Sequence, residues 1–257
     1  MGADDAESVG WAGALAVADG ALCYVGALSD ADGHHHAATQ IVSALSGSFE
    51  LTDGGGHCAV AQAAIIPSSC EHSIRVGHRR VRGALVFLDP GSALGSGIAE
   101  LVSGSSDVTR WVAAGHEFVR SMDLTTGDPA SILEMLADVR GADHRPGHRL
   151  WHPSVRLAVE RVTELLPEPV TLVEVANSVG LSPSRLSRLF NEQVGQSFPA
   201  YIRWRRLHLA IEALQQGVSL TDAAHTAGFT DSAHANRVCH EMFGLSPSLA
   251  SRHLVWG

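Results

Sequence analysis

The sequence predicts an α+β protein of two domains, in which a β-rich N-terminal half precedes an all-α C-terminal half. Short β-prone segments separated by turn residues fill the first hundred positions, whereas the last hundred contain one helix-turn-helix pattern twice. A length of 257 residues leaves room for two domains that each bury a core.

The N-terminal half is expected to be a β-domain followed by helices. Strands are expected at 21–25, 40–45, 47–51, 58–61, 64–66 and 84–88. Their short, regular spacing is typical of a barrel or a sandwich, and residues 1–97 are assigned to it. The apolar period then becomes helical, so residues 98–140 are expected to form helices that make a dimer or simply pack on the strands. Residues 141–151 are expected to link this half to residues 152–257.

Composition narrows the class of protein. A hydrophobic content of 45% with 18% charged residues is typical of a globular protein rather than a disordered one. No apolar run approaches the roughly 20 residues of a membrane helix, and the first residues lack the basic start of a secretion signal. We therefore expect a cytoplasmic protein without membrane contact. The four cysteines show no C-x-x-C spacing and are expected to be free thiols.

The net charge of −9 is unevenly distributed along the chain. The first 150 residues contain nine Arg against 18 Asp and Glu, whereas the remaining residues contain nine Arg against nine Asp and Glu. The acidity therefore belongs to the N-terminal half. A neutral C-terminal half predicts modest affinity for DNA of arbitrary sequence, because neutralised phosphates supply most of that affinity.

The C-terminal half repeats one helical corner, at residues 172–190 and 220–237. In each copy an Ala stands four positions before a Gly, and the two glycines, Gly180 and Gly228, are 48 residues apart. A small residue lets two helices approach, and glycine adopts the left-handed turn that a side chain disfavours. The repeat favours a pair of DNA-reading motifs over a plain bundle with two corners.

A long amphipathic helix is expected at residues 198–214, between the two copies. It carries three arginines near its start, Arg203, Arg205 and Arg206. Such a helix would hold the two readers at a fixed separation. A coiled-coil dimerisation helix is the alternative, but the apolar pattern is too short and too irregular for one.

Three segments of the C-terminal half are especially distinctive. They read Leu-Ser-Pro-Ser-Arg-Leu-Ser-Arg-Leu-Phe at 181–190, Gly-x-Ser-Phe-Pro-Ala-Tyr-Ile-Arg-x-x-Arg-Leu at 195–207, and Gly-Phe-x-Asp followed by Phe-Gly-Leu-Ser-Pro-Ser within 228–248. With them, residues 152–250 resemble the AraC/XylS family of bacterial transcription regulators. The resemblance implies a seven-helix module whose two recognition helices enter successive major-groove segments on one face of DNA.

The resemblance also implies which side chains contact DNA. The matching positions are Ser184, Arg185, Ser187 and Arg188 in the first reader, and Ser232, His234, Asn236 and Arg237 in the second. Arginine can bond bidentately to guanine, and serine can address bases or phosphate. For the first reader's arginines, a solvated surface charge is the alternative.

The second reader departs from the family pattern. It has Ala235 and Cys239 where Phe is usual, and His240 and Glu241 where a basic pair is usual. A smaller core and an added acid predict a weaker grip on DNA, so specificity should depend more on the first reader.

The β-rich half resembles a cupin barrel, as N-terminal halves of this family often do. The cupin metal motif runs His-x-His, then Glu or Gln, then Pro-x-Gly-x-x-His, and His34, His36, Gln40 and His72 fall at those positions, with Ser69 in the Gly place. The two nearby histidines would share one face of a strand. Three imidazoles and an amide oxygen would suit Zn, Ni, Fe(II) or Cu(II).

Other readings of this half remain open. The cupin fold often persists in this family without metal, and a histidine cluster beside a turn is often only surface. A small organic effector is a further candidate, with an apolar wall from Trp11, Val42 and Phe49. Three more side chains, His57, Cys58 and Cys70, are candidates for additional, softer ligands.

The sequence as a whole predicts a DNA-binding transcriptional regulator whose N-terminal domain senses a metal or a small molecule, and not an enzyme. The expected partners are promoter DNA, the effector, a second copy of the chain and, for an activator, RNA polymerase. A metal-dependent cupin enzyme fused to a DNA reader is the alternative from another class. A constitutive DNA-binding protein without an effector is the third.

Overall fold

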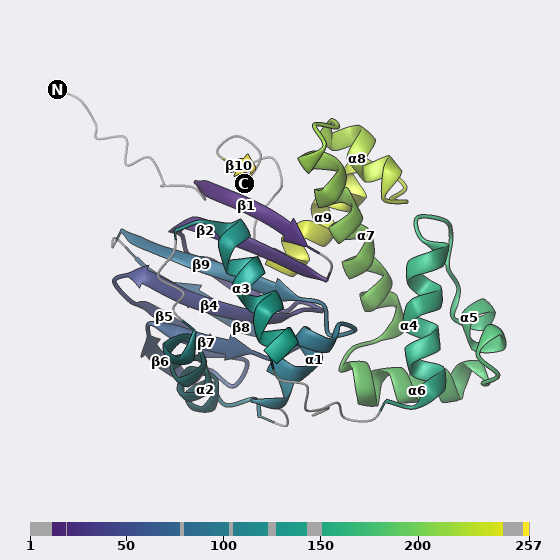
Figure 1. Ribbon diagram of the computed structural model, residues 1–257, viewed down its shortest axis with the longest axis horizontal. Helices are drawn as coiled ribbons and strands as arrows, with labels where there is room; N and C mark the ends of the chain where they lie inside the picture. The colour runs from purple at the N-terminus through teal and green to yellow at the C-terminus, as the bar shows by residue number, and fades with distance from the viewer. Residues whose placement is uncertain are drawn as a thin grey trace.

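The computed structural model describes residues 12–18, 20–77, 80–102, 105–122, 127–142, 151–243 and 254–256. Its N-terminal half consists of two facing β-sheets with helices, and its C-terminal half is helical (Figure 1). The expected α+β organisation, a sheet domain followed by a helical domain, is confirmed. Trp11 and most of the expected linker, 143–150, lie outside the described residues.

The larger sheet has six strands, antiparallel except for its outermost pair. Their order is β10 (Leu254–Trp256), β1 (Gly13–Ala18), β2 (Ala21–Leu28), β9 (Val81–Leu88), β4 (Thr39–Ser46) and β7 (Ala63–Ile66). Strand β10, close to the C-terminus, pairs parallel to β1. The end of the chain thus returns to the N-terminal domain after the last reading helix.

The smaller sheet has four antiparallel strands. Their order is β3 (Ala31–His34), β8 (His72–Arg75), β5 (Phe49–Asp53) and β6 (Cys58–Ala61). The sequence prediction missed β1, β8 and β10, so the C-terminal half is not entirely helical. It anticipated β3 only as the strand expected to carry His34 and His36. In β3, the residues Ala-Asp-Gly-His have low β propensity, so this strand depends on pairing with β8 rather than on local preference.

The closed barrel expected for residues 1–97 is wrong for the described strands, because these form two separate sheets. On one side, helix α2 (Val108–Ser121) packs against both β7 and β6. A helix there covers the edges that a barrel would close by strand pairing. On the other side, β10 extends the six-stranded sheet instead of joining it to β3.

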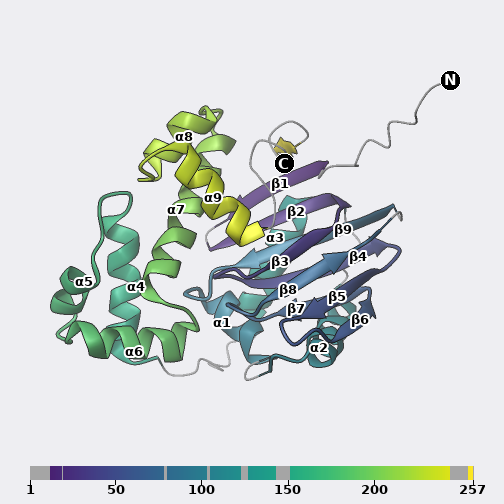
Figure 2. The same cartoon turned by 180° about the vertical axis from the view of Figure 1, so that it is seen from behind.

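Three helices belong to the N-terminal domain: α1 (Ala93–Glu100), α2 and α3 (Pro129–Ala142). Helical structure therefore begins before residue 98, the boundary expected from the period change. Helix α3 lies across β1 and β2, while the four-stranded sheet covers the opposite face of the larger sheet (Figures 1 and 2). Trp111, Ile132 and Leu136 are fully buried, so α2 and α3 bury apolar side chains within the domain.

The C-terminal domain has six described helices. They are α4 (Pro153–Leu165), α5 (Leu172–Ser178), α6 (Pro183–Val194), α7 (Phe198–Gln215), α8 (Leu220–Thr226) and α9 (Ser232–Phe243). Helix α7 runs from the pair α5–α6 to the pair α8–α9, as expected for the long helix between the copies (Figure 2). Phe190 and Tyr201 are buried where α6 and α7 meet, and Trp204 on α7 is buried facing Phe243 of α9.

Two simpler expectations can be compared with the structure. All four cysteines are free thiols, as the spacing predicted. Among the described residues, no helix has both the length and the apolar character that crossing a membrane requires.

Candidate functional site

The two helical corners have the same geometry, position by position. In the first, Leu181 N–H donates to the Ala176 carbonyl over 2.9 Å; in the second, Phe229 N–H donates to the Ala224 carbonyl over 3.0 Å. Thr171 and Ser219 cap α5 and α8 by accepting from the backbone N–H three residues ahead, each over 3.2 Å.

The turn glycines complete this match. Gly180 and Gly228 adopt left-handed φ values of 70° and 79°. That region favours glycine because a Cβ would approach the carbonyl oxygen. The sequence repeat is therefore a structural repeat of two helix-turn-helix corners.

The first corner presents the predicted reading residues on its second helix. Ser182 accepts from the Arg185 N–H over 3.3 Å and so caps α6. Leu186 is fully buried on the opposite side, which leaves Arg185 and Arg188 exposed. Ser184 is also exposed, whereas Ser187 is half-buried.

The second corner presents its predicted residues from α9. Ser232, Asn236 and Arg237 are exposed, but His234 is half-buried against Phe229, with ring centroids 5.4 Å apart. The His234 N–H donates to the Asp231 carboxylate over 2.6 Å. His234 therefore takes part in the local contacts that form the start of α9, and only part of its side chain is exposed to solvent.

A cluster of three histidines, His34, His36 and His72, lies between the two sheets together with Gln40. These four residues come from different elements of the fold. His34 on β3 and His72 on β8 are directly opposite each other in the smaller sheet, with ring centroids 4.3 Å apart. Gln40 comes from β4 in the larger sheet. His36 lies in the connection after β3 rather than on the strand, so the expectation that His34 and His36 share a strand face is wrong.

The potential ligand nitrogens of the three histidines lie within 4.8 Å of one another. In each histidine the Nδ1 atom contacts a backbone carbonyl oxygen. The pairs are His34 with Asp32 over 2.7 Å, His36 with Ala38 over 2.8 Å, and His72 with Cys70 over 3.0 Å. A carbonyl only accepts, and a neutral imidazole has one N–H, so the proton is on Nδ1. The Nε2 lone pairs remain available, which is the tautomer of a metal-ligating histidine with its outer partner in place.

Gln40 brings an amide oxygen to the same point. Its Oε1 lies 2.8 Å from Nε2 of His36 and 3.1 Å from Nε2 of His72. Three acceptors directed at one another repel unless a cation lies between them or the amide turns its NH₂ group inward. Ligands about 2.1 Å from a metal lie about 3 Å apart at neighbouring octahedral positions. The Gln40 oxygen therefore has the spacing of a neighbouring ligand to both nitrogens, and imidazoles with an amide oxygen are a donor set that suits a divalent transition metal.

The cluster is neutral at physiological pH. Burial, reinforced by the repulsion that protonated His34 and His36 would exert on each other, lowers the pKa of His36 to about 4. Burial also lowers the pKa of His72 well below its usual range, and lowers that of His34. Neutral imidazoles are the form that binds metal, so protons compete weakly for these nitrogens at pH 7.

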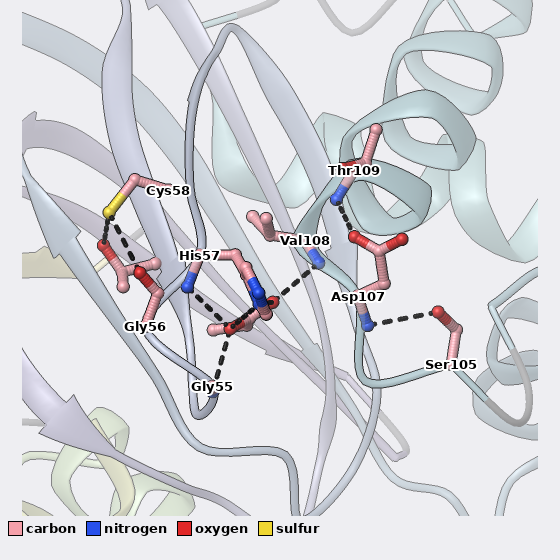
Figure 3. A network of polar contacts seen from close by, with 10 residues as sticks. Gly55, Gly56, His57, Cys58, Ser105, Asp107, Val108 and Thr109 are labelled. Atoms are coloured by element: carbon pink, nitrogen blue, oxygen red, sulfur yellow. Dashed lines mark hydrogen bonds and ion pairs between the residues drawn. The ribbon is translucent and has the colours of Figure 1, made fainter.

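The extra ligand candidates do not join this cluster. Figure 3 shows His57 in the turn before β6 and Cys58 at the first position of β6, near the start of α2 at Val108. There the Asp53 carboxylate accepts from the N–H groups of Gly55, His57 and Val108. Burial works to raise the pKa of Asp53, but these N–H groups outweigh it and hold that pKa below its ordinary value. This network fixes the start of α2 and the turn.

Cys70 and Ser69 shape the histidine cluster through their backbone rather than through their side chains. The Cys70 carbonyl positions His72, as described above, while its thiol is outside the cluster. Ser69, which stands in the Gly place of the cupin motif, has a φ of 62°. A left-handed residue is therefore needed there, and serine adopts that conformation. The predicted apolar wall is represented by Val42 and Phe49, both buried.

Sequence reasoning missed the residues that join the two domains. Arg205 on α7 donates to the Asp89 carboxylate over 2.7 Å, and Tyr201 donates to the same carboxylate oxygen over 3.4 Å. His208, also on α7, contacts the Ala21 carbonyl over 3.3 Å. Asp89 stood in a turn-like Asp-Pro-Gly-Ser stretch, and nothing in its spacing indicated a partner 116 residues away.

The comparisons with known proteins bear first on the helical half. Residues 175–252 match the family described as "Helix-turn-helix domain". The C-terminal half carries an AraC-type helix-turn-helix domain. This domain contains both corners described above.

Two curated relatives extend further along the chain. GlxA of Rhizobium meliloti, named an HTH-type transcriptional regulator, is 30% identical over 178 residues, which are 68% of this chain and 53% of GlxA. NphR of Rhodococcus, named a transcriptional activator, is 27% identical over 214 residues, 79% of this chain and 62% of NphR. The chain thus spans less than two thirds of either relative's length.

Among solved structures, ToxT of Vibrio cholerae has a similar fold, with a TM-score of 0.58 at 10% identity. The match covers 91% of this chain and 96% of ToxT, which was solved with an unsaturated fatty acid bound. The likeness concerns the fold: an N-terminal sheet domain and a C-terminal helical domain in one chain.

Proposed function

We propose that the chain is a transcriptional regulator that binds duplex DNA through its two helix-turn-helix corners and senses a divalent transition metal at the histidine cluster. The DNA-binding part is supported by the repeated corner and by relatives named as transcriptional regulators. The repeat places an exposed polar helix surface on each of α6 and α9. Reading residues on two such helices would contact two major-groove segments.

The sensing part depends on one observation: the ligand nitrogens of three histidines converge, and the Gln40 oxygen contacts two of these rings. His34, His36, Gln40 and His72 would hold the ion, and Zn, Ni, Fe(II) and Cu(II) all suit imidazole ligands. The cupin likeness of this domain is proposed on the same four positions. A small organic effector has no comparable set of convergent groups in its favour among the described residues.

We propose sensing rather than catalysis. His36 and His72 are each 1% exposed, so a substrate would have to displace packed side chains to reach an ion held there. A buried ion can instead favour one arrangement of the chain over another, which is what a sensor requires. A second copy of the chain and, for an activator, RNA polymerase remain proposed partners.

The test begins with protein purified without a chelating column or a histidine tag. DNA duplexes that bind it are selected from a random library, and the affinity for the selected site is then measured with and without Zn²⁺, Ni²⁺, Co²⁺ or Cu²⁺. We expect selection of a defined sequence, one metal per chain, and a DNA affinity that changes on metal addition. Failure to select any sequence would overturn DNA reading.

Two variants make the metal arm specific. His72→Ala should abolish stoichiometric metal binding and the metal response of DNA binding. His35→Ala is the matched control, because His35 stands between two cluster residues but is exposed. Wild-type protein that takes up no metal, or a His72→Ala variant that responds like wild type, would overturn metal sensing while leaving DNA binding intact.

A further inference from the structure

The end of strand β9 touches both the histidine cluster and the second reader. Phe87 lies opposite Gln40 in the β4–β9 pair, so the two side chains share a sheet face. The Phe87 ring meets the His36 ring edge to face, with centroids 5.3 Å apart at 85°. It meets the Phe243 ring in the same manner, with centroids 4.8 Å apart at 73°.

Phe243 is the last residue of α9, the second reading helix. Its ring also faces Trp204 on α7, with centroids 6.4 Å apart. A continuous series of aromatic contacts therefore runs from His36 through Phe87 to the reading helix and on to the helix between the readers. Helix α9 additionally packs against β3, the strand that carries His34.

Asp89, two residues after Phe87, binds side chains of helix α7. Asp89 accepts from Arg205 and Tyr201 there, and it is 2% exposed. The segment from Phe87 to Asp89 thus contacts both helices that set the position of the second reader relative to the first. The exposed reading residues of α9, Ser232, Asn236 and Arg237, stay uncovered by this docking.

We propose that the Phe87–Phe243 contact couples metal binding at the histidine cluster to the position of the second reader, with the metal favouring the docked arrangement. This proposal rests on the metal-sensing part of the proposed function. It adds the route of regulation and its direction.

The physical reason is the orientation of His36. A metal ligand has to keep its ring at a fixed angle, and neighbours that hold the ring increase affinity. Phe87 packs against the face or edge of that ring, and Phe243 in turn restricts Phe87. Release of α9 would remove this restraint, so the docked arrangement should bind metal more tightly.

Coupling between two sites is reciprocal. A residue on the reading helix that touches no ligand should therefore change metal affinity. Position 243 meets this condition: its ring contacts Phe87 and Trp204, whereas the potential ligands come from β3, β4, β8 and the connection after β3. This makes the proposal testable without a known operator.

The experiment is a Co²⁺ titration of the full chain, followed by the visible absorption of the bound ion. We expect Phe243→Ala to weaken Co²⁺ binding at least about fivefold, the lower end of usual coupling strengths. Phe243→Leu keeps an apolar side chain and serves as the second variant if the alanine variant folds poorly. It should show a smaller loss of Co²⁺ affinity in the same direction.

Val238→Ala is the matched control, because Val238 is buried on the same helix and is 2% exposed. It should lower the melting temperature and leave Co²⁺ affinity unchanged. Equal Co²⁺ affinity in wild type and both Phe243 variants would overturn the coupling alone, as would an equal loss in Val238→Ala. Wild-type protein that fails to bind Co²⁺ would overturn metal sensing itself, so the two failures are distinguishable.

Discussion

Arg205 and Asp89 form an ion pair over 2.7 Å that joins the helix between the two readers to the end of a strand in the N-terminal domain. Their side chains are 14% and 2% exposed. A pair so removed from water needs both partners, because a single remaining charge would be buried without compensation. The backbone N–H of Gly91 supplies a further hydrogen bond to the same carboxylate over 2.7 Å.

We predict that Asp89→Ala destabilises the protein by about 3–5 kcal/mol, the usual range when one member of a buried pair is removed. Urea unfolding measures this. The matched control is Asp32→Ala, which removes an ion pair to Arg75 of the same 2.7 Å length but with exposed side chains. That change should cost at most about 1 kcal/mol. Similar losses in the two variants would contradict the importance of burial.

Arg188→Ala is predicted to weaken specific DNA binding more than Arg237→Ala. Arg188 is exposed on α6, whereas Arg237 interacts electrostatically with Asp231, so a neighbouring carboxylate already attracts its charge. Loss of one bidentate base contact costs about 1–3 kcal/mol. Gel shifts at fixed salt on the selected duplex measure both variants, and equal losses would refute the unequal roles of the two readers.

Gly228→Ala is predicted to destabilise the C-terminal domain more than Gly180→Ala. Both positions have left-handed φ values, so each substitution should cost about 1–2 kcal/mol of backbone strain. A Cβ at 228 would in addition overlap the Pro167 carbonyl oxygen, whereas a Cβ at 180 would meet open space. Thermal melting of the two variants isolates the steric contribution, and identical melting temperatures would rule it out.

Stability is predicted to fall as the pH decreases from about 6.5 towards 4. The pKa of His36 in the folded protein is about 4, because of burial, whereas an unfolded histidine titrates near 6.5. Between these values the unfolded chain binds more protons, so protonation favours unfolding by up to about 1.4 kcal/mol per pH unit. Below pH 4 this contribution levels off.

Unfolding curves across this pH range, measured on metal-free protein, provide the check. Other groups also titrate there, so the comparison between variants is decisive. His36→Gln should flatten the dependence on pH, whereas His35→Gln, at an exposed position, should retain the wild-type slope. A His36→Gln variant with an unchanged slope would show that burial of His36 does not control acid stability.

The helical half could be predicted well from the sequence because its signals are local. A buried Ala, a left-handed Gly and a capping Ser or Thr specify a helical corner within about fifteen residues, and the structure places Gly180 and Gly228 as expected. The candidate cluster was also recognisable, since the spacing of His34, His36, Gln40 and His72 is a sequence pattern. The structure brings these four together, while metal binding stays a prediction.

The sheet half was predicted less well because its elements depend on distant partners. Strand β3 has little β propensity and forms through pairing with β8. The expected barrel is replaced by two sheets, and α2 covers their edges at β7 and β6. His57 and Cys58 were candidates for extra ligands, but hydrogen bonding to Asp53 and the adjacent turn places them elsewhere.

The sequence by itself determined that this protein has two reading corners and a histidine-rich β-domain, because both depend on short-range spacing. Only the tertiary structure decided that the tip of β9 lies between them, with Phe87 against His36 and Phe243, and Asp89 against Arg205. Contacts across more than a hundred residues arise from the packing of whole domains, and no local pattern encodes which side chains meet there.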